Sequence, residues 1–167
     1  MARGPHRLYL IRHAIAAERG DEWPDDTKRP LTERGAKRMA QIMAGFADLA
    51  EPVDLVLTSP LTRALETAQI VAAGLDPRPS VRSLPALAPG HGPSSTATAI
   101  AAAARDAQHV ALVGHEPGLG ALAAWLIGAR SPVPFKKGGI CRIDAAHWPP
   151  RRDGQLIWMA TPKILRK

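Results

Sequence analysis

Long apolar runs are missing from this sequence of 167 residues. No stretch approaches the roughly 20 consecutive apolar residues that a membrane-spanning helix needs, which excludes an integral membrane protein of the helical type. The opening MARGPHRLYLIRH holds an apolar run of only four residues before Arg12 and His13, so no signal peptide is expected. We therefore predict a cytoplasmic protein with no membrane partner.

Cysteine and aromatic residues are also scarce. The single cysteine, Cys141, excludes a disulfide within the chain and a zinc site built on paired cysteines. It lies in the alternating run GGICRID, without the long anion-binding loop of a thiolate phosphatase, so we expect a buried apolar side chain rather than a nucleophile. Aromatic residues make up 4% and no nucleic-acid-binding motif is present, so nucleic acid is not an expected partner.

Positive charge is plentiful and unevenly placed. Residues 130–167 carry 9 basic and 2 acidic residues, whereas residues 1–129 carry 13 of each, so the last segment holds the whole net charge of +7. A solvated basic face is the simplest interpretation of the segment 130–167. A surface that recruits an acidic protein partner is the functional alternative.

Hydrophobic periodicity alternates between strand-like and helix-like segments, and 46% hydrophobic with 22% charged residues suits one globular domain over 1–167. Helices are expected over residues 32–49, from Ser59 as N-cap with Pro60 in first position to Gly74, from Pro93 onward, and over 118–127. Such alternation predicts a single-domain α/β three-layer sandwich with a mostly parallel central sheet flanked by helices. The expected strands are Leu8–Ile11, Val53–Leu57, Val81–Leu84, His109–Val113, Gly139–Ala145 and Gln155–Ala160.

Four residues with suitable chemistry follow three of these strands. Arg12 and His13 come after the first strand, Arg63 follows the second, and His115 follows the fourth. Ligands collect at the carboxyl ends of strands in open α/β sheets. Arginine forks match phosphate oxygens, and a neutral imidazole can attack phosphorus or carry a proton. The four residues therefore predict a phosphoryl-handling site.

The segments around these residues form four blocks: LYLIRHA at 8–14, PLTERG at 30–35, LTSPLTRALETA at 57–68 and ALVGHEPGL at 111–119. In their order and spacing they resemble the histidine phosphatase superfamily, and the short chain with its RHA opening resembles the small bacterial phosphohistidine phosphatases. The resemblance covers roughly residues 7–127 and implies a phosphoglycerate mutase-like fold.

The resemblance also implies roles for the catalytic residues. His13 matches the nucleophile that becomes phosphorylated, Arg12 and Arg63 match the arginines that bind the phosphoryl oxygens, and His115 matches the second histidine, which contacts the phosphoryl group and serves in proton transfer. Guanidinium groups then offset the phosphoryl charge, so no metal and no cofactor are expected. Nearby positive charge should keep His13 neutral and nucleophilic.

Two departures from the family pattern stand out. Ala14 replaces a frequent glycine, which would strain the backbone by ~1–2 kcal/mol if that position needs a positive φ. No Asp or Glu occurs between residues 77 and 105, and Ala86 stands where relatives often carry the acid that protonates the leaving oxygen. A phosphohistidine substrate can leave as neutral imidazole, so the missing acid favours P–N over P–O substrates.

Other polar residues carry weaker expectations. Glu18, Asp21 or Glu22 on the long loop 14–31, or His91 on the second loop, could replace the missing acid, although solvation of the loops is the preferred interpretation. Glu66 lies one helical turn after Arg63 and could orient it, and Glu116 is expected to pair or cap near the fourth helix.

The sequence thus predicts a metal-independent phosphatase acting on phosphohistidine of an acidic signalling or phosphotransfer protein. Alternatives are a small-molecule phosphomonoesterase of the same superfamily, acting on a small phosphate ester, and a phosphoprotein-binding module with little turnover. A dinucleotide site is suggested by G-x-G-x-x-A at Gly118–Ala123, but this motif follows the last parallel strand instead of the first.

Overall fold

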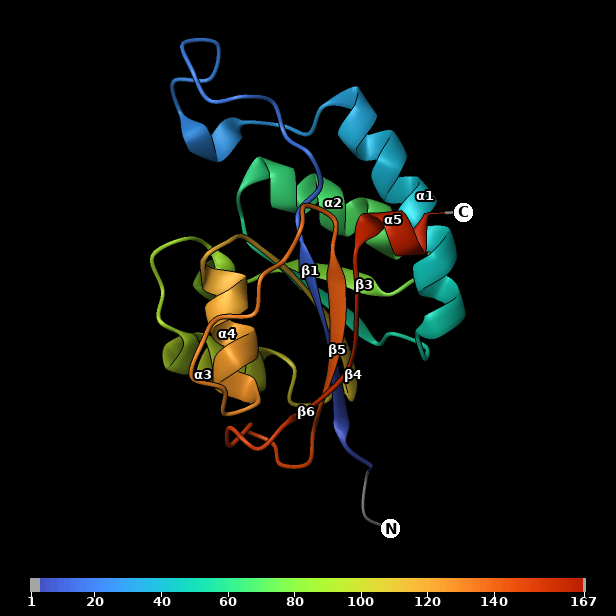
Figure 1. Cartoon of the computed structure of the whole chain (residues 1–167), viewed down its shortest axis with the longest axis vertical. Coiled ribbons are helices and arrows are strands. Elements are labelled where there is room, and N and C mark those ends of the chain that lie inside the picture. Colours follow the sequence, from blue (N-terminus) through green and yellow to red (C-terminus); the bar gives the residue numbers. More distant parts are fainter. Residues whose placement is uncertain (1–3, 167) are drawn as a thin grey trace.

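A computed structural model describes residues 4–166 of the chain. A six-stranded sheet forms its centre, in the order β3-β2-β4-β1-β5-β6 (Figure 1). The strands β1 to β4 pair in parallel, whereas β5 pairs antiparallel with β1 and β6 antiparallel with β5. The strands are β1 (His6–Arg12), β2 (Leu55–Thr58), β3 (Ser80–Ser83), β4 (His109–Gly114), β5 (Ile140–Ala145) and β6 (Gln155–Ala160).

Helices cover both faces of the sheet, which confirms the predicted three-layer α/β architecture (Figure 1). One face carries α1, α2 and α5, and the other carries α3 and α4. The helices are α1 (Glu33–Leu49), α2 (Thr62–Ala73), α3 (Pro93–Ala103), α4 (Gly118–Leu126) and α5 (Pro162–Leu165), with the short 3-10 helices η1 (Asp26–Lys28) and η2 (Pro85–Leu87). In residues 4–166 no helix is long and apolar enough to cross a membrane.

The pleat of β1 divides the core into two parts. Tyr9 and Ile11 pack beneath α1 and α2, whereas Leu8 and Leu10 pack beneath α3 and α4. All four side chains are fully buried. Successive side chains of a strand point to opposite faces of the sheet, and both faces are covered here. The strand therefore needs apolar residues at consecutive positions, which explains the apolar run in its sequence.

Cys141 lies in β5 and is fully buried in the second core, beside the α3 and α4 face. Burial raises the pKa of its thiol to about 12, so it remains protonated at neutral pH. The expectation of a small apolar core residue is confirmed.

The predicted start of α2 is wrong. The helix begins at Thr62 with Leu61 as N-cap, not at Pro60 with Ser59 as N-cap. The Ser59 hydroxyl accepts the N–H of Leu61 at 3.2 Å, but it also contacts His115, and this tertiary bond holds Ser59 in the turn before the helix.

The carboxyl ends of three parallel strands meet at one edge of the sheet. Arg12 of β1 pairs in register with Gly114 of β4, and Thr58 of β2 pairs with Val113. Because β5 runs the other way, its first residue, Ile140, lies beside Ile11 at the same edge. The loop before β5 is thereby brought to the strand ends, together with the loop 14–31 that follows β1.

Candidate active site

The structure brings the four predicted residues together at this edge. Arg12 ends β1, His13 and His115 follow β1 and β4, and Arg63 lies in the first turn of α2. The His13 amide continues the sheet by donating to the Gly114 carbonyl at 3.0 Å. The two imidazole centroids are 5.1 Å apart, and all four side chains line one pocket, named here the central pocket.

His13 is buried and held in one tautomer. Its Nδ1 lies 2.7 Å from the carbonyl oxygen of Ala14, which can only accept, so Nδ1 carries the proton and Nε2 has the free lone pair. Burial is the main cause that lowers the pKa of His13 to about 4; the charges of Arg63, Arg12 and Lys137 contribute, and the hydrogen bond to Ala14 opposes them. The imidazole is therefore neutral at pH 7, as expected, but burial is the main cause and positive charge is secondary.

His115 is fixed by Ser59. Its Nε2 lies 2.7 Å from the Ser59 hydroxyl, which already accepts the Leu61 N–H. In the described part of the chain that hydroxyl has no other acceptor, so its proton points to Nε2 and the His115 proton resides on Nδ1. Burial is the main cause that lowers the pKa of His115 to about 3; repulsion from His13 when that ring is protonated, and from Arg63, also contributes.

The two arginines are partly anchored and partly free. Arg12 donates from Nη1 to the Phe135 carbonyl at 2.7 Å, and Arg63 donates from Nη1 and Nη2 to the carbonyl and carboxylate of Asp26 at 2.9 and 3.1 Å. The Nε atoms of both arginines and Nδ1 of His115 are buried without a partner within residues 4–166. Buried N–H groups are normally satisfied, so three unpaired donors on side chains that line one pocket indicate a site for an anion.

Asp26 is a site residue that the sequence did not reveal. Its carboxylate accepts from Arg63 and also from Arg29 Nε at 3.0 Å, and Arg29 in turn donates to the Ala17 carbonyl. Burial would raise the pKa of Asp26, but the hydrogen bond from Arg29 and the charges of Arg63 and Arg29 outweigh it and lower the pKa. An ionised Asp26 thus attaches the loop 14–31 to the base of the central pocket. Several carboxylates lie in this loop, and no spacing in the sequence distinguishes Asp26 from them.

Lys137 and Thr67 were also missed. Lys137 lines the central pocket, because Gly138 donates its N–H to the carbonyls of Arg12 and His13 and holds the loop before β5 against β1. Gly138 has φ +80, a conformation that favours glycine. The Thr67 hydroxyl accepts from the Ala14 amide at 3.1 Å and donates to the Arg63 carbonyl at 2.7 Å, which links the segment after β1 to the first turn of α2. The i, i+4 spacing of Arg63 and Thr67 on one helix was the available signal.

The expectations for Glu116, Glu66 and Ala14 have different outcomes. Glu116 accepts the Gly120 amide at 2.8 Å and caps the start of α4, as expected. Glu66 accepts the Leu31 amide at 2.7 Å, so it secures the end of the loop and does not orient Arg63 as expected. Ala14 is not strained, because Arg152 is the one non-glycine residue with positive φ in the described range.

The glycine motif at 118–123 has a packing explanation. A Cβ on Gly120 would lie 2.3 Å from the Val133 carbonyl oxygen and 3.0 Å from the Glu116 carboxylate. Gly120 is therefore required for close packing of α4 against the loop that follows it. The residues of this motif do not line the central pocket.

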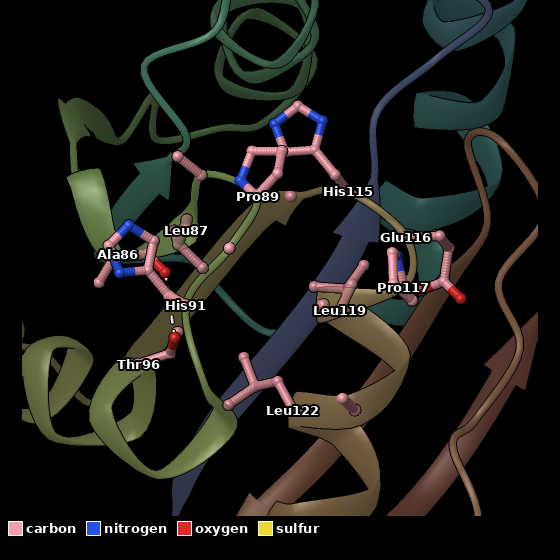
Figure 2. A pocket seen from close by; sticks show the side chains of 15 residues that line it. Ala86, Leu87, Pro89, His91, Thr96, His115, Glu116, Pro117, Leu119 and Leu122 are labelled. Atoms are coloured by element: carbon pink, nitrogen blue, oxygen red, sulfur yellow. Dashed lines mark hydrogen bonds between the residues drawn. The ribbon is translucent and has the colours of Figure 1, made fainter.

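A second, apolar pocket adjoins the central pocket and shares Pro89, His115, Glu116 and Pro117 with it. Figure 2 shows Leu119 and Leu122 of α4 facing the segment that carries Ala86, Leu87 and His91. Its cavity of about 260 Å³ is large enough for a ring-sized group.

The candidate replacement acids are distributed unevenly over these pockets. Glu18 lines the central pocket, His91 lines the apolar pocket, and Asp21 and Glu22 line neither. The other carboxylates in the linings are Asp26, held by two arginines, and Glu116, held by the α4 amide. In residues 4–166 no group of three or more His, Cys, Asp or Glu side chains is placed to hold a metal ion.

Taken as chemistry, the central pocket combines a neutral imidazole with a free Nε2 lone pair and three N–H donors without partners. Such an arrangement can hold the three oxygens of a phosphoryl group while a nitrogen attacks the phosphorus.

Comparison with known proteins places the chain in a family. The family model of the histidine phosphatase superfamily (branch 1) matches residues 8–88. An uncharacterized protein of Picosynechococcus sp. is 37% identical over 95% of this chain and 98% of its own length.

Two solved structures are similar to this fold. The structure of the protein histidine phosphatase SixA complexed with tungstate has a TM-score of 0.83 at 24% identity, over 96% of this chain and 99% of that chain. A candidate phosphohistidine phosphatase SixA from Agrobacterium tumefaciens has a TM-score of 0.75 at 28% identity, over 95% of this chain and 99% of that chain.

Proposed function

The chain belongs to the histidine phosphatase superfamily, and on this premise we propose that it is a metal-independent phosphatase for phosphohistidine on a protein. The observation that carries the proposal is the convergence of His13, with its free Nε2, and of Arg12, Arg63 and His115 on one pocket, with the two imidazole centroids 5.1 Å apart. Similarity to the SixA proteins, one of which is described as a protein histidine phosphatase, supports the same substrate class.

In the first step, the lone pair on Nε2 of His13 forms a bond to phosphorus. The bond from phosphorus to the substrate nitrogen breaks, and its electrons stay on the substrate imidazole. Arg12, Arg63 and His115, which line the same pocket as His13, offset the charge on the phosphoryl oxygens. The Nδ1–H bond to Ala14 is kept throughout, which stabilises the positive charge that the His13 ring acquires.

In the second step, a water oxygen attacks the phosphorus and the bond to Nε2 breaks. Both protons of the water remain on the phosphate, which leaves as dihydrogen phosphate, and His13 is again neutral. This sequence balances without a proton from the protein, provided that the other ring nitrogen of the substrate histidine already carries its proton.

A phosphate ester makes a greater demand, because its oxygen leaves as an alkoxide unless an acid protonates it. The position of Ala86 offers no acid, and Asp26 and Glu116 are committed to other hydrogen bonds. Among the lining carboxylates this leaves Glu18 as the one candidate acid for an ester, whereas a P–N substrate needs no acid, so the P–N substrate is favoured.

A second candidate function is hydrolysis of a small phosphate ester. The apolar pocket beside His115 favours it, because the pocket could receive an apolar leaving group. An aryl ester would suit this site, since a phenolate leaves without strong acid assistance.

The test is turnover in EDTA of a phosphohistidine protein and of an aryl phosphate ester, with wild type, His13→Ala and the control His147→Ala. His147 is an exposed histidine paired with Asp153, so its loss should leave both rates unchanged. Cleavage of phosphohistidine that is lost only in His13→Ala is expected, with acid-labile phosphate trapped on His13. Cleavage of the aryl ester alone would support the second candidate, and no turnover with phosphoprotein binding would indicate a binding module.

A further inference from the structure

A third pocket lies beside the central pocket and is named here the cationic pocket. Arg12 and Lys137 line both pockets, so a molecule in the cationic pocket would adjoin the phosphoryl site. Its cavity measures about 390 Å³. Its lining combines the cations Arg12, Arg38, Lys136, Lys137 and Arg166 with the apolar residues Ile15, Met39, Ile42 and Pro162.

The four cations that this pocket adds to Arg12 come from three parts of the chain. Arg38 comes from α1, Lys136 and Lys137 from the loop before β5, and Arg166 from the residue after α5. Two other cations of the basic segment 130–167 are engaged elsewhere. Arg142 pairs with Asp144 at 2.7 Å, and Arg152 lies over the Trp125 ring. Within the segment 130–167, these two arginines therefore make other contacts, whereas Lys136, Lys137 and Arg166 line the cationic pocket.

Four of the five cations of this pocket have no ion-pair partner within the described residues 4–166. Within residues 4–166, none of Arg38, Lys136, Lys137 and Arg166 has a carboxylate within 4.0 Å, and the Nε of Arg166 is buried without a hydrogen-bond partner. Desolvation lowers the pKa of Arg38, and the charges of Arg34 and Arg166 lower it further, which indicates mutual repulsion. Unpaired like charges around one cavity are unfavourable unless an anion binds there.

We propose that the cationic pocket binds an acidic segment of the phosphoprotein substrate, with a carboxylate against Arg38 and Arg166 and an aliphatic side chain against Met39 and Ile42. This docking site rests on the proposed function for its choice of occupant. The apolar floor explains why the occupant is a peptide segment with apolar side chains rather than a bare anion. Because Arg12 and Lys137 are shared, the docked segment lies next to the histidine that presents its phosphoryl group.

The direct test is binding of a fluorescein-labelled peptide without a phosphoryl group. Its central histidine is flanked by Asp, Glu and Leu, and a comparison peptide carries Asn and Gln in place of the acids. The pocket variant is Arg38→Gln with Arg166→Gln. The matched control is Arg105→Gln with Arg130→Gln, which removes the same charge from residues that follow α3 and α4 and do not line the cationic pocket.

In fluorescence anisotropy at about 0.1 M salt, where distant charges are largely screened, the pocket variant should bind the acidic peptide about tenfold more weakly than wild type. The control variant should stay within about twofold of wild type. The proposal is overturned if the pocket variant binds like wild type, if both variants weaken alike, or if wild type does not prefer the acidic peptide.

Turnover separates this inference from the proposed function. With a phosphohistidine form of the acidic peptide, the pocket variant should raise KM about tenfold at unchanged kcat, and its aryl ester kinetics should match those of wild type. If wild type does not hydrolyse the phosphorylated peptide while anisotropy shows the expected pattern, the proposed function fails and the docking site stands. If turnover is present and anisotropy shows no difference, the docking site fails alone.

Discussion

The two pockets that flank the central pocket both have a largely apolar lining, but they differ in the charged residues that this lining includes. The apolar pocket is built by η2 and α4 and presents Leu87, Leu119 and Leu122 beside His115. The cationic pocket is built by α1, the loop before β5 and the end of the chain, and presents four cations beside Arg12. One side therefore suits an uncharged ring and the other suits carboxylates.

Under the proposed function, reaction and recognition are therefore located in separate parts of this site. The central pocket supplies groups that any phosphoryl transfer to His13 would need, whereas each flank favours one kind of substrate. Variants of the central pocket should affect all substrates alike, and variants of a flank should affect one class.

The largest effect is expected for Arg63→Gln, which removes an unpaired donor and the anchor for Asp26. We expect kcat/KM to fall by roughly 10²–10³ for both a phosphohistidine peptide and an aryl ester, by analogy with loss of one oxyanion donor. Arg78→Gln, an exposed arginine beyond α2, is the control. A loss confined to one substrate class would contradict the expectation that the central pocket serves all substrates alike.

The central pocket should also make stability depend on pH. The pKa of His13 is lowered to about 4 and that of His115 to about 3, against 6.5 for both groups at their ordinary value. Between these values the unfolded chain binds more protons than the folded one, so stability is complete above about pH 6.5 and falls as the pH drops. For each of the two histidines, the free energy of unfolding should fall by about 1.4 kcal/mol for every unit that the pH drops between 6.5 and 4.

Urea denaturation at pH 7, 5.5 and 4.5 measures this slope, and His13→Gln or His115→Gln should each flatten it relative to wild type. The same neutrality predicts that kcat/KM does not decline when the pH is raised from 5 to 7. A decline over that range would show that His13 does not act as a neutral nucleophile.

The role of the apolar pocket can be tested with Ala86→Glu. This variant places a carboxyl group on η2, which contributes no acid to the lining of that pocket. We expect kcat/KM for an alkyl phosphate, whose alkoxide leaves poorly, to rise about tenfold relative to the aryl ester. Ala86→Gln has nearly the same size and no acid, so it should give no gain. An equal gain for both variants would assign the effect to packing.

The smallest effect is expected for Asp26→Asn. The amide keeps one acceptor but loses the charge that orients Arg63 and Arg29, so kcat should fall about three- to fivefold with little change in stability. Asp21→Asn removes a charge from the same loop without touching the central pocket. Equal kinetics for the two variants would mean that Asp26 only orders the loop.

Much of the fold could be predicted because its strands are short, apolar and separated by helices with clear limits. Pro93 begins α3 as expected, and α4 starts at the predicted Gly118. The error at Ser59 arose because the sequence pattern of an N-cap is local, whereas the hydrogen bond of that hydroxyl to His115 spans 56 positions. Tertiary contacts of this kind override local preferences.

Some residues of the site could likewise be predicted from the sequence, and others could not. Arg12, His13, Arg63 and His115 directly follow strands or open a helix, so topology alone places them at one edge. Asp26 was not predictable, because its pairing with Arg63 depends on how the loop 14–31 folds back over the strand ends. Lys137 was not predictable either, because it reaches the site through the antiparallel direction of β5.

The pairing of β1 with strands on both sides has a consequence for which length changes this chain can accept. Leu8 and Tyr9 enter opposite cores, and the strand ends at Arg12, immediately before His13. An inserted or deleted residue here would exchange the two sets of core side chains or rotate the reactive imidazole out of place. The exposed turn at Arg151–Asp153 has no such constraint on its length. The number of residues between the core side chains of β1 and the His13 imidazole is therefore fixed, and we expect changes in chain length to be tolerated in the exposed loops.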